Sequence, residues 1–325
     1  MKYEGGLKTD PITHGLIGAS LAFLSGHAPS LDDPIFLAST LGAMLPDLDI
    51  VTHVKGRLNY LLKHRGASHS LLALGGMAVG LGSVLYSFFP ATSWSTLFYW
   101  ALLGTLSHGM ADLLNSFGAE LLWPFYKKKL TVNMIMLTDP VVFTLFLASL
   151  VVSLNWPQAT QAAGLAFIGS SLYLTYRQIG RLKVRKDLMA RYGLNDKREV
   201  KVLPAMYRPF NWNFLLFQEQ LVRFGTIRGK HPKVERTLPR WDEADPNVST
   251  AMEGAVAAIF DQFTPYYHIV AAEDENAECW VEFMDLRYWT REDFLYTGKV
   301  VMNSEGEIAQ ESFHTTNREG ILLGY

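Results

Sequence analysis

The sequence predicts an α-helical membrane domain, made of four transmembrane helices plus an N-terminal helical hairpin, followed by a small β-rich soluble domain. Charge is the first observation, because residues 1–176 hold 18 Asp, Glu, Lys and Arg, whereas residues 177–325 hold the remaining 42. The second observation is the long uncharged runs in the first part, and the third is the strand-like patterns after residue 200. We therefore expect a membrane domain at 1–180, a basic juxtamembrane helix or linker at 181–199, and a cytosolic antiparallel domain at 200–325.

The N-terminal hairpin is the first expected element. Residues 12–26 and 34–45 are apolar, and a turn signal separates them at 29–33. Both helices are shorter than the roughly 20 residues that cross a bilayer, so we expect them to be only partly embedded.

The four transmembrane helices come next, from two stretches that are almost free of charge. No Asp, Glu, Lys or Arg occurs from Ser70 to Ala111, and only Asp139 is charged between Leu130 and Tyr176. Each stretch contains one polar, proline-bearing break, so each predicts two spans of roughly 20 residues. The expected spans are 70–89, 95–116, 138–154 and 160–177.

Basic residues occur in every second connection between these helices. They are Lys2, Lys8, Lys55, Arg57, Lys63, Arg65, Lys127, Lys128, Lys129, Arg177, Arg181, Lys183, Arg185 and Lys186. Short cytoplasmic loops collect Lys and Arg, so we expect a multi-pass protein of the cell (inner) membrane with both termini in the cytoplasm. The same topology places the acids and histidines described below at the cytoplasmic face.

The soluble part is expected to be an antiparallel sheet. Residues 266–271, 278–286 and 294–302 are rich in β-branched and aromatic side chains, and the turn at 303–306 precedes another short strand. The net charge of −2 argues against a nucleic-acid partner. The single cysteine, Cys279, excludes an intrachain disulfide framework and a cysteine-based structural zinc site.

Acids and histidines gather in four short clusters of the apolar half. These are Asp10-Pro-Ile-Thr-His14, Pro46-Asp-Leu-Asp49, His64-Arg-Gly-Ala-Ser-His69 and His108-Gly-Met-Ala-Asp112. Ionisable groups are costly within or beside a membrane, so each needs a compensating partner. A divalent cation suits mixed imidazole and carboxylate ligands, and the clusters therefore predict a metal site held by membrane helices.

Two of these clusters each contain a pair of candidate ligands, one of a histidine with an aspartate and the other of two aspartates. His108 and Asp112 lie four apart on a predicted helix and share one face, and a polar contact between helices is the alternative. Asp47 and Asp49 follow a proline, so we expect a helix end or loop where both carboxylates converge on one cation or bridge two. Ordinary capping is the alternative for that pair.

The remaining clusters contain candidate histidine ligands beside an arginine that can bind anions or an aspartate that can cap a helix. His64 and His69 flank Arg65, whose planar cation can clamp phosphate or carboxylate oxygens, and a plain basic loop is the alternative. Asp10 and Asp139 each precede a proline, so we expect both mainly to cap helices, with support of a ligand as a lesser role. His14, one turn after Asp10, is the better ligand candidate. The histidines expected to be structural or solvent-facing are His27, His53, His231, His268 and His314.

As a set, the four clusters resemble the motifs of the YdjM-like family of inner-membrane, metal-dependent hydrolases, over roughly residues 9–180. The polar C-terminal part is similar to a long, Gram-positive-type branch of that family. The resemblance implies metal binding more strongly than a reaction, because some members are described as binding a repressor protein. The His-x-x-x-Asp element also resembles zinc-dependent phospholipase C and related nucleases, which implies phosphodiester chemistry.

We therefore expect a membrane-bound hydrolase that uses one or two divalent ions, zinc or manganese, to activate water. The expected substrate is a phosphoester or other ester at the cytoplasmic face, such as a phospholipid or amphiphilic ester of the bilayer. Arg65 is expected to stabilise the developing anion, and Asp49 is expected to act as general base where it is not a ligand. The expected metal ligands are His14, Asp47, Asp49, His64, His69, His108 and Asp112.

The alternative is a non-catalytic, metal-stabilised membrane protein that binds and regulates a cytosolic protein partner through residues 200–325. Transport is a third, disfavoured function, because the ionisable groups gather at one face and not near the bilayer midplane.

Overall fold

A computed structural model describes residues 11–27, 29–155, 159–206, 208–229, 231–242, 244–273, 279–289, 293–315 and 320–323. The prediction for Asp10 lies outside these residues, and the side chain of His53 is likewise outside the described part. The described chain falls into two compact units. The helical unit comprises 11–182 with 208–210, and the β-rich unit comprises 183–206 with the described residues from 211 onward.

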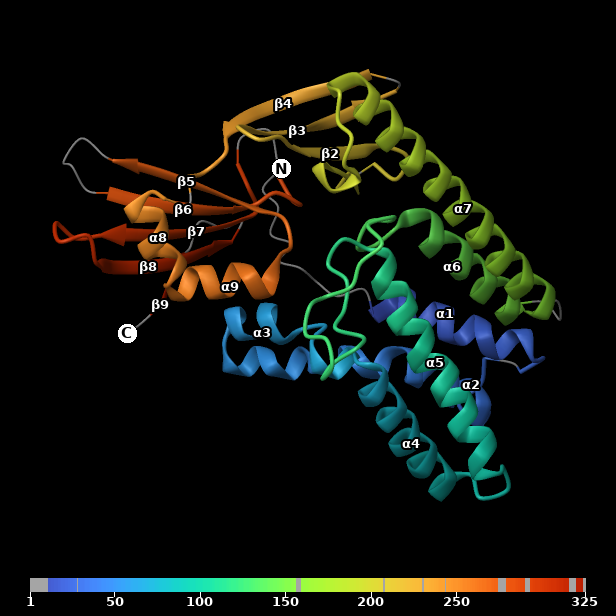
Figure 1. The fold of residues 1–325 in the computed structure, drawn as a ribbon. Coiled ribbons are helices and arrows are strands. Elements are labelled where there is room, and N and C mark those ends of the chain that lie inside the picture. The colour runs from blue at the N-terminus through green and yellow to red at the C-terminus, as the bar shows by residue number, and fades with distance from the viewer. Residues whose placement is uncertain are drawn as a thin grey trace. The chain divides into compact units, whose positions relative to one another are not determined.

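Five helices of the helical unit, α1, α2, α4, α5 and α6, begin at a side-chain cap or a proline. Asp33 accepts hydrogen bonds from the amides of Ile35 and Phe36, and Ser70 and Ser93 cap the next two long helices in the same way. The helices, shown in Figure 1, are α1 (Pro11–Leu24), α2 (Pro34–Met44), η1 (Leu45–Lys55), α3 (Arg57–Lys63), η2 (Ala67–His69), α4 (Leu71–Phe88), α5 (Trp94–Leu114), α6 (Pro140–Asn155) and α7 (Ala159–Tyr192). The predicted helical N-terminal region is therefore confirmed.

Two helices among the described residues are long and apolar enough to cross a membrane, not the four that we expected. They are Pro34–Val51 and Leu71–Phe88. The short α6 has only 16 residues, and α5 carries His108 and Asp112 within its apolar sequence. The second hairpin helix ends at Met44, within one residue of its expected end, and the helical path continues through Pro46 as a 3-10 helix. Proline lacks an amide hydrogen, and the chain tightens from α2 into the 3-10 helix η1.

Three glycines let α1, α2 and α5 approach one another closely. A Cβ atom on Gly104 of α5 would lie 2.3 Å from the carbonyl oxygen of Ser39 on α2. The same oxygen would lie 2.6 Å from a Cβ on Gly18 of α1, and Gly42 of α2 has an equally close contact with Ala101 of α5. Small residues at helix crossings allow backbones to touch, which is typical of membrane helices. This packing brings the polar ends of the three helices together.

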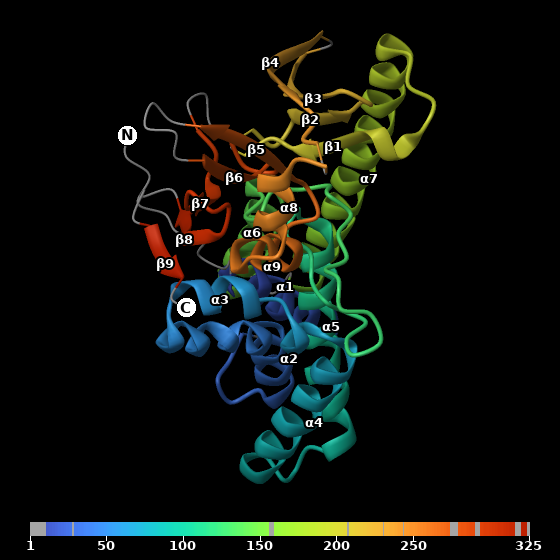
Figure 2. The ribbon, with the colours of Figure 1, turned by 60° about the vertical axis from the view of Figure 1, so that its left-hand side comes forward.

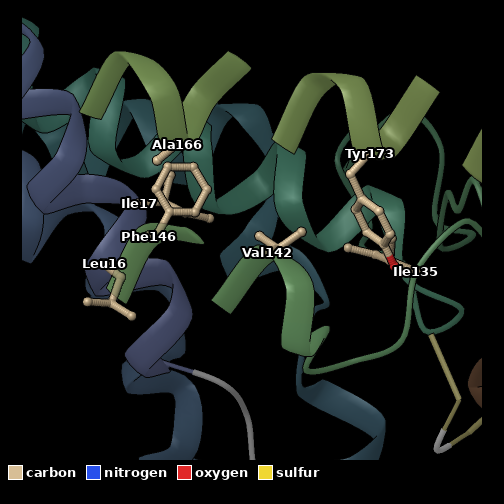
Figure 3. Close-up of a cluster of buried hydrophobic side chains, with 7 residues drawn as sticks. All are labelled: Leu16, Ile17, Ile135, Val142, Phe146, Ala166 and Tyr173. Atoms are coloured by element: carbon tan, nitrogen blue, oxygen red, sulfur yellow. The ribbon is translucent and has the colours of Figure 1, made fainter. Parts of the chain in front are cut away.

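A second apolar core joins α1, α6 and α7, as Figure 3 shows. Its buried residues are Leu16, Ile17, Ile135, Val142, Phe146, Ala166 and Tyr173. The hydroxyl of Tyr173 donates to Oδ2 of Asp139 at 2.9 Å. The other oxygen of Asp139 accepts from the Val141 amide at 3.0 Å, so Asp139 caps α6 as expected.

The β-rich unit contains two antiparallel sheets, each with its strands in chain order (Figure 2). The first sheet is β1 (Val200–Pro204), β2 (Trp212–Phe217), β3 (Leu221–Arg228) and β4 (His231–Pro239). The second is β5 (Tyr267–Glu273), β6 (Cys279–Asp285), β7 (Tyr296–Met302), β8 (Ile308–Thr315) and β9 (Gly320–Leu323). The predicted β-rich part is confirmed, although the sequence analysis foresaw neither the first sheet nor the helices α8 (Pro246–Met252) and α9 (Ala255–Phe263).

Apolar side chains of both sheets form one shared core. Leu215 and Phe224 of the first sheet pack in the same cluster as Met284 of the second. Leu188, near the end of α7, is buried against the first sheet, so the segment expected as a separate juxtamembrane helix is the continuation of α7.

Candidate metal centre

The candidate site lies in the helical unit, where four helices and the loop after α3 contribute side chains. Asp47 and Asp49 come from η1, His64 directly follows α3, His69 belongs to η2, and α5 supplies His108 and Asp112 near its C-terminal end. α1 contributes His14, and the loop between α3 and η2 contributes Arg65. The buried members are His14, Asp47, Arg65, His69, His108 and Asp112.

Three ligand atoms form a small triangle at the centre of the site. The Nε2 atoms of His69 and His108 are 3.1 Å apart, and Oδ2 of Asp112 lies 3.4 Å from the first and 3.3 Å from the second. Ligand atoms held 2.0–2.1 Å from one tetrahedral ion are themselves separated by about 3.3 Å. The triangle therefore has the dimensions of one face of a tetrahedral metal site.

Hydrogen bonds fix the tautomers of the two imidazoles at this triangle. Nδ1 of His108 donates to the carbonyl oxygen of Ala43 at 2.8 Å, which leaves a lone pair on Nε2. Ser68 donates its hydroxyl hydrogen to Asp49, so its oxygen can accept from Nδ1 of His69 at 3.0 Å. Burial lowers the pKa of His69 and favours the neutral ring. In the neutral form with Nδ1 protonated, both rings would present an Nε2 lone pair to the same point, as metal-binding histidines do.

Asp47 supplies a fourth candidate ligand. Its Oδ1 atom lies 3.7 Å from Nε2 of both His69 and His108. Among the described residues, neither carboxylate oxygen of Asp47 has a hydrogen-bond partner, although both are buried. Burying an ionised carboxylate without compensation is costly, and a cation beside it removes that cost.

His14 and Arg65 approach the opposite oxygen of Asp112. Nη2 of Arg65 is 2.8 Å from Oδ1 of Asp112, and Nε2 of His14 is 3.6 Å from the same atom. The His14 ring also stacks on His108, with centroids 3.9 Å apart. Nε and Nη1 of Arg65 have no hydrogen-bond partner within the described part of the chain. Asp112 therefore separates the two-histidine side of the site from a side with one histidine and a guanidinium.

Asp49 stands behind this set and orders the loop that carries the histidines. It accepts hydrogen bonds from Nδ1 of His64 at 2.8 Å, from the Arg65 amide at 3.3 Å and from the Ser68 hydroxyl at 3.1 Å. His64 remains close enough to form a possible ligand group with Asp47 and His69, all within 4.8 Å of one another.

All seven predicted ligands and Arg65 thus belong to one connected group of contacts, and metal ligation by them stays a prediction. Asp139 lies elsewhere, as the cap of α6. His27, expected to lack an acidic partner, instead pairs with Asp33 at 2.7 Å, because the turn before α2 folds back. Ser68 and the Ala43 carbonyl also contact the histidines and were not predicted, although a hydroxyl adjacent to His69 in the sequence is a usable signal.

Comparisons with known proteins agree with the two-part organisation. Residues 10–184 match the profile of the YdjM inner membrane protein family, and residues 246–321 match the YfhP C-terminal alpha/beta plait domain. A curated protein from Bacillus subtilis (strain 168), described as "Uncharacterized protein YfhP", is 26% identical over 291 residues, which cover 86% of each chain. The search of solved structures gave no significant match.

Proposed function

Because the chain belongs to the YdjM inner membrane protein family, we propose that it is a membrane-bound, metal-dependent hydrolase that acts on a phosphoester or another ester. The observation that carries this proposal is the triangle formed by His69, His108 and Asp112, with edges of 3.1, 3.4 and 3.3 Å. A purely structural polar cluster does not need two imidazole nitrogens and a carboxylate oxygen to face one buried point.

The same residues define what would hold the metal. His69, His108, Asp112 and Asp47 provide two nitrogens and two oxygens, a donor set suited to zinc or manganese. His14 faces the far oxygen of Asp112 and would serve a second ion. A divalent ion bound there supplies Lewis acidity and makes water acidic enough to act as a nucleophile near neutral pH.

Arg65 is the residue that would bind the anionic part of a substrate. Its Nη2 is held by Asp112, which fixes the plane of the guanidinium, while Nε and Nη1 lack protein partners among the described residues. A planar cation with two free donors matches two oxygens of a phosphate or carboxylate. Since Arg65 is only 2% exposed, its charge acts with little screening by bulk water.

The two carboxylates of η1, Asp47 and Asp49, have different contacts and therefore different proposed roles. Asp49 already accepts three hydrogen bonds, so its contacts favour a positioning role over the base or ligand roles expected from the sequence. Oδ1 of Asp47 faces the two histidines as the fourth candidate ligand, and Oδ2, which has no hydrogen bond from the described residues, is available to accept a proton from water.

We also propose a multi-pass arrangement with both termini in the cytoplasm. α7 supports a membrane position despite its modest apolarity, because its apolar residues gather on one face that the helical unit leaves uncovered. That face consists of Leu165, Ile168, Leu172, Tyr176 and Ile179. The basic residues after it are typical of a cytoplasmic end. Cysteine-accessibility mapping of the connections, in a Cys279→Ser background, tests this topology.

Elemental analysis combined with hydrolysis assays tests the function. The purified full chain should retain zinc or manganese and hydrolyse at least one member of a panel of phosphomonoesters, phosphodiesters and carboxylic esters. His108→Ala and Asp112→Asn should lose both properties. His231→Ala changes an exposed histidine of β4 outside the cluster and should lose neither.

Other outcomes separate the alternatives. Equal metal content in the wild type and both site variants would remove these residues from the ligand set. Retained metal without hydrolysis, together with specific capture of a cytosolic protein by residues 200–325, would favour the non-catalytic regulatory function.

A further inference from the structure

The loop from Leu122 to Lys128 presents apolar and aromatic side chains that the protein does not cover. Phe125 is 89% exposed, and Leu122, Trp123 and Tyr126 are also exposed. Two exposed lysines, Lys127 and Lys128, follow directly. Contiguous exposed aromatic residues are uncommon on a surface that contacts only water, and they mark an interaction site.

This loop is fixed at both ends to the segment that carries the candidate metal centre. On its first side, the amide of Glu120 donates to the carbonyl oxygen of Arg65 at 3.0 Å. On its second side, Nζ of Lys129 donates to the carbonyl oxygen of His64 at 2.9 Å. Paired backbone hydrogen bonds between Ala119 and Leu130, of 3.1 and 2.9 Å, close the base of the loop. The loop is therefore a defined projection beside the site.

The loop also begins beside the first residue of an apolar helix. The carbonyl oxygen of Leu121 accepts a hydrogen bond of 2.9 Å from the amide of Leu71, the first residue of α4. α4 is one of the two helices that are apolar and long enough to cross a membrane, and Leu71 and Leu72 are themselves exposed. The end of a span lies at the boundary between hydrocarbon and headgroups.

We propose that residues 122–128 form a contact with the membrane interface, selective for anionic phospholipid headgroups. Trp and Tyr side chains favour this layer because they combine an apolar ring with a polar atom, and Phe125 would reach the upper acyl chains. Lys127 and Lys128 would contact headgroup phosphates, since basic residues beside a span attract anionic lipid. The contact requires neither bound metal nor catalysis. Where the proposed hydrolase function holds, it keeps Arg65 and the metal centre at headgroup level.

Fluorescence quenching of a labelled loop tests this contact. The chain has one cysteine, so Cys279→Ser with Phe125→Cys allows a single environment-sensitive fluorophore at the tip of the loop. The full chain is reconstituted in phosphatidylcholine vesicles, with or without phosphatidylglycerol. The label should be quenched by lipids that carry a nitroxide on the acyl chain and shielded from aqueous acrylamide. A matched label at Glu305→Cys, in the exposed turn after β7, should show the reverse.

A second comparison tests the headgroup preference. Phosphatidylglycerol should increase the shielding of the label in the chain with both lysines, and Lys127→Gln with Lys128→Gln should abolish that increase. Equal acrylamide quenching at positions 125 and 305, with no effect of the nitroxide lipids, would overturn the membrane contact. An unchanged phosphatidylglycerol effect in the double variant would overturn the role of the lysines. Helical circular dichroism and a wild-type elution volume in size-exclusion chromatography establish that each variant is folded.

Discussion

The Nε2 atoms of His69 and His108 lie 3.1 Å apart in a buried place, and each ring uses its other nitrogen against a fixed oxygen partner. Two nitrogen lone pairs at this distance repel each other unless a proton or a cation lies between them. Burial disfavours the protonated form of His69, and a divalent cation between the two nitrogens would remove their repulsion without protonating that ring.

Metal binding should therefore stabilise the folded protein. At a free metal concentration about 100 times the dissociation constant, binding to the native state contributes about 2.7 kcal/mol. Thermal unfolding of the detergent-solubilised chain, with EDTA or with added zinc or manganese, measures this effect. His108→Ala should unfold at the same temperature in both conditions. A metal-dependent shift of equal size in His108→Ala would contradict the assignment.

Ser68 should tune metal affinity without being a ligand. Its hydroxyl connects Asp49 to Nδ1 of His69 and so holds the ring in the tautomer that leaves Nε2 free. Loss of such a supporting contact commonly weakens metal affinity about 10–100-fold. Titration with a competing chelator should reveal this change in Ser68→Ala. Ser87→Ala, which removes an exposed hydroxyl bonded only to the backbone of α4 in the described contacts, is the matched control and should keep full affinity.

The identity of the candidate ligands could be predicted because acids and imidazoles are rare in apolar sequence. The different roles of these ligands could not be predicted. Asp47 and Asp49 look equivalent in sequence, and only the path of η1 determines that Asp49 contacts His64 whereas Asp47 has no hydrogen bond from the described residues. The close crossings at Gly18 and Gly104 depend on which helices pair, which spacing along one helix does not encode.

The edge strand β4 of the first sheet escaped prediction for a related reason. β4 is an edge strand whose residues are mostly partly exposed, so it lacks the alternation of apolar and polar residues that identifies a half-buried strand. The second sheet was recognisable because β6 and β7 bury every second residue over much of their length.

Gly104→Ala should disturb the site through backbone packing alone. The added methyl group would lie 2.3 Å from the carbonyl oxygen of Ser39 and would force α2 and α5 apart. Overpacking of this kind costs about 1–3 kcal/mol, and here it also displaces His108, one turn further along α5. We expect lower metal content and a lower unfolding temperature. Gly80→Ala, where nothing lies within 4 Å of the added atom, should leave metal content unchanged.

Asp112→Asn should destabilise even the metal-free protein. It leaves the buried guanidinium of Arg65 without the carboxylate that lies 2.8 Å from Nη2. Breaking one side of a buried ion pair costs about 3–5 kcal/mol, because the remaining charge stays buried. Urea unfolding in EDTA measures the change. Combining it with Arg65→Gln should recover part of the loss, and a double variant whose loss equals the sum of the two single losses would argue against this pairing.

The β-rich unit should lose stability in mild acid because of His268 on β5. The side chain is fully buried beside Trp241, with ring centroids 5.2 Å apart, and burial lowers its pKa from 6.5 to about 4. As the pH falls below 6.5, the unfolded chain binds a proton at this residue before the folded chain does. The stabilisation is therefore complete above pH 6.5 and is lost progressively as the pH falls towards 4. From these two pKa values, linkage gives a loss of about 2 kcal/mol between pH 7.5 and pH 5.

Urea unfolding of the full chain at these two pH values, followed by tryptophan fluorescence, isolates this contribution when wild type is compared with His268→Phe. Phenylalanine keeps an aromatic ring at this position and cannot be protonated, so the variant should lose about 2 kcal/mol less than the wild type does on acidification. His231→Ala, at an exposed position of the same unit, should retain the wild-type pH dependence. An equal loss in wild type and His268→Phe would mean that His268 takes up its proton in the folded state as easily as in the unfolded chain.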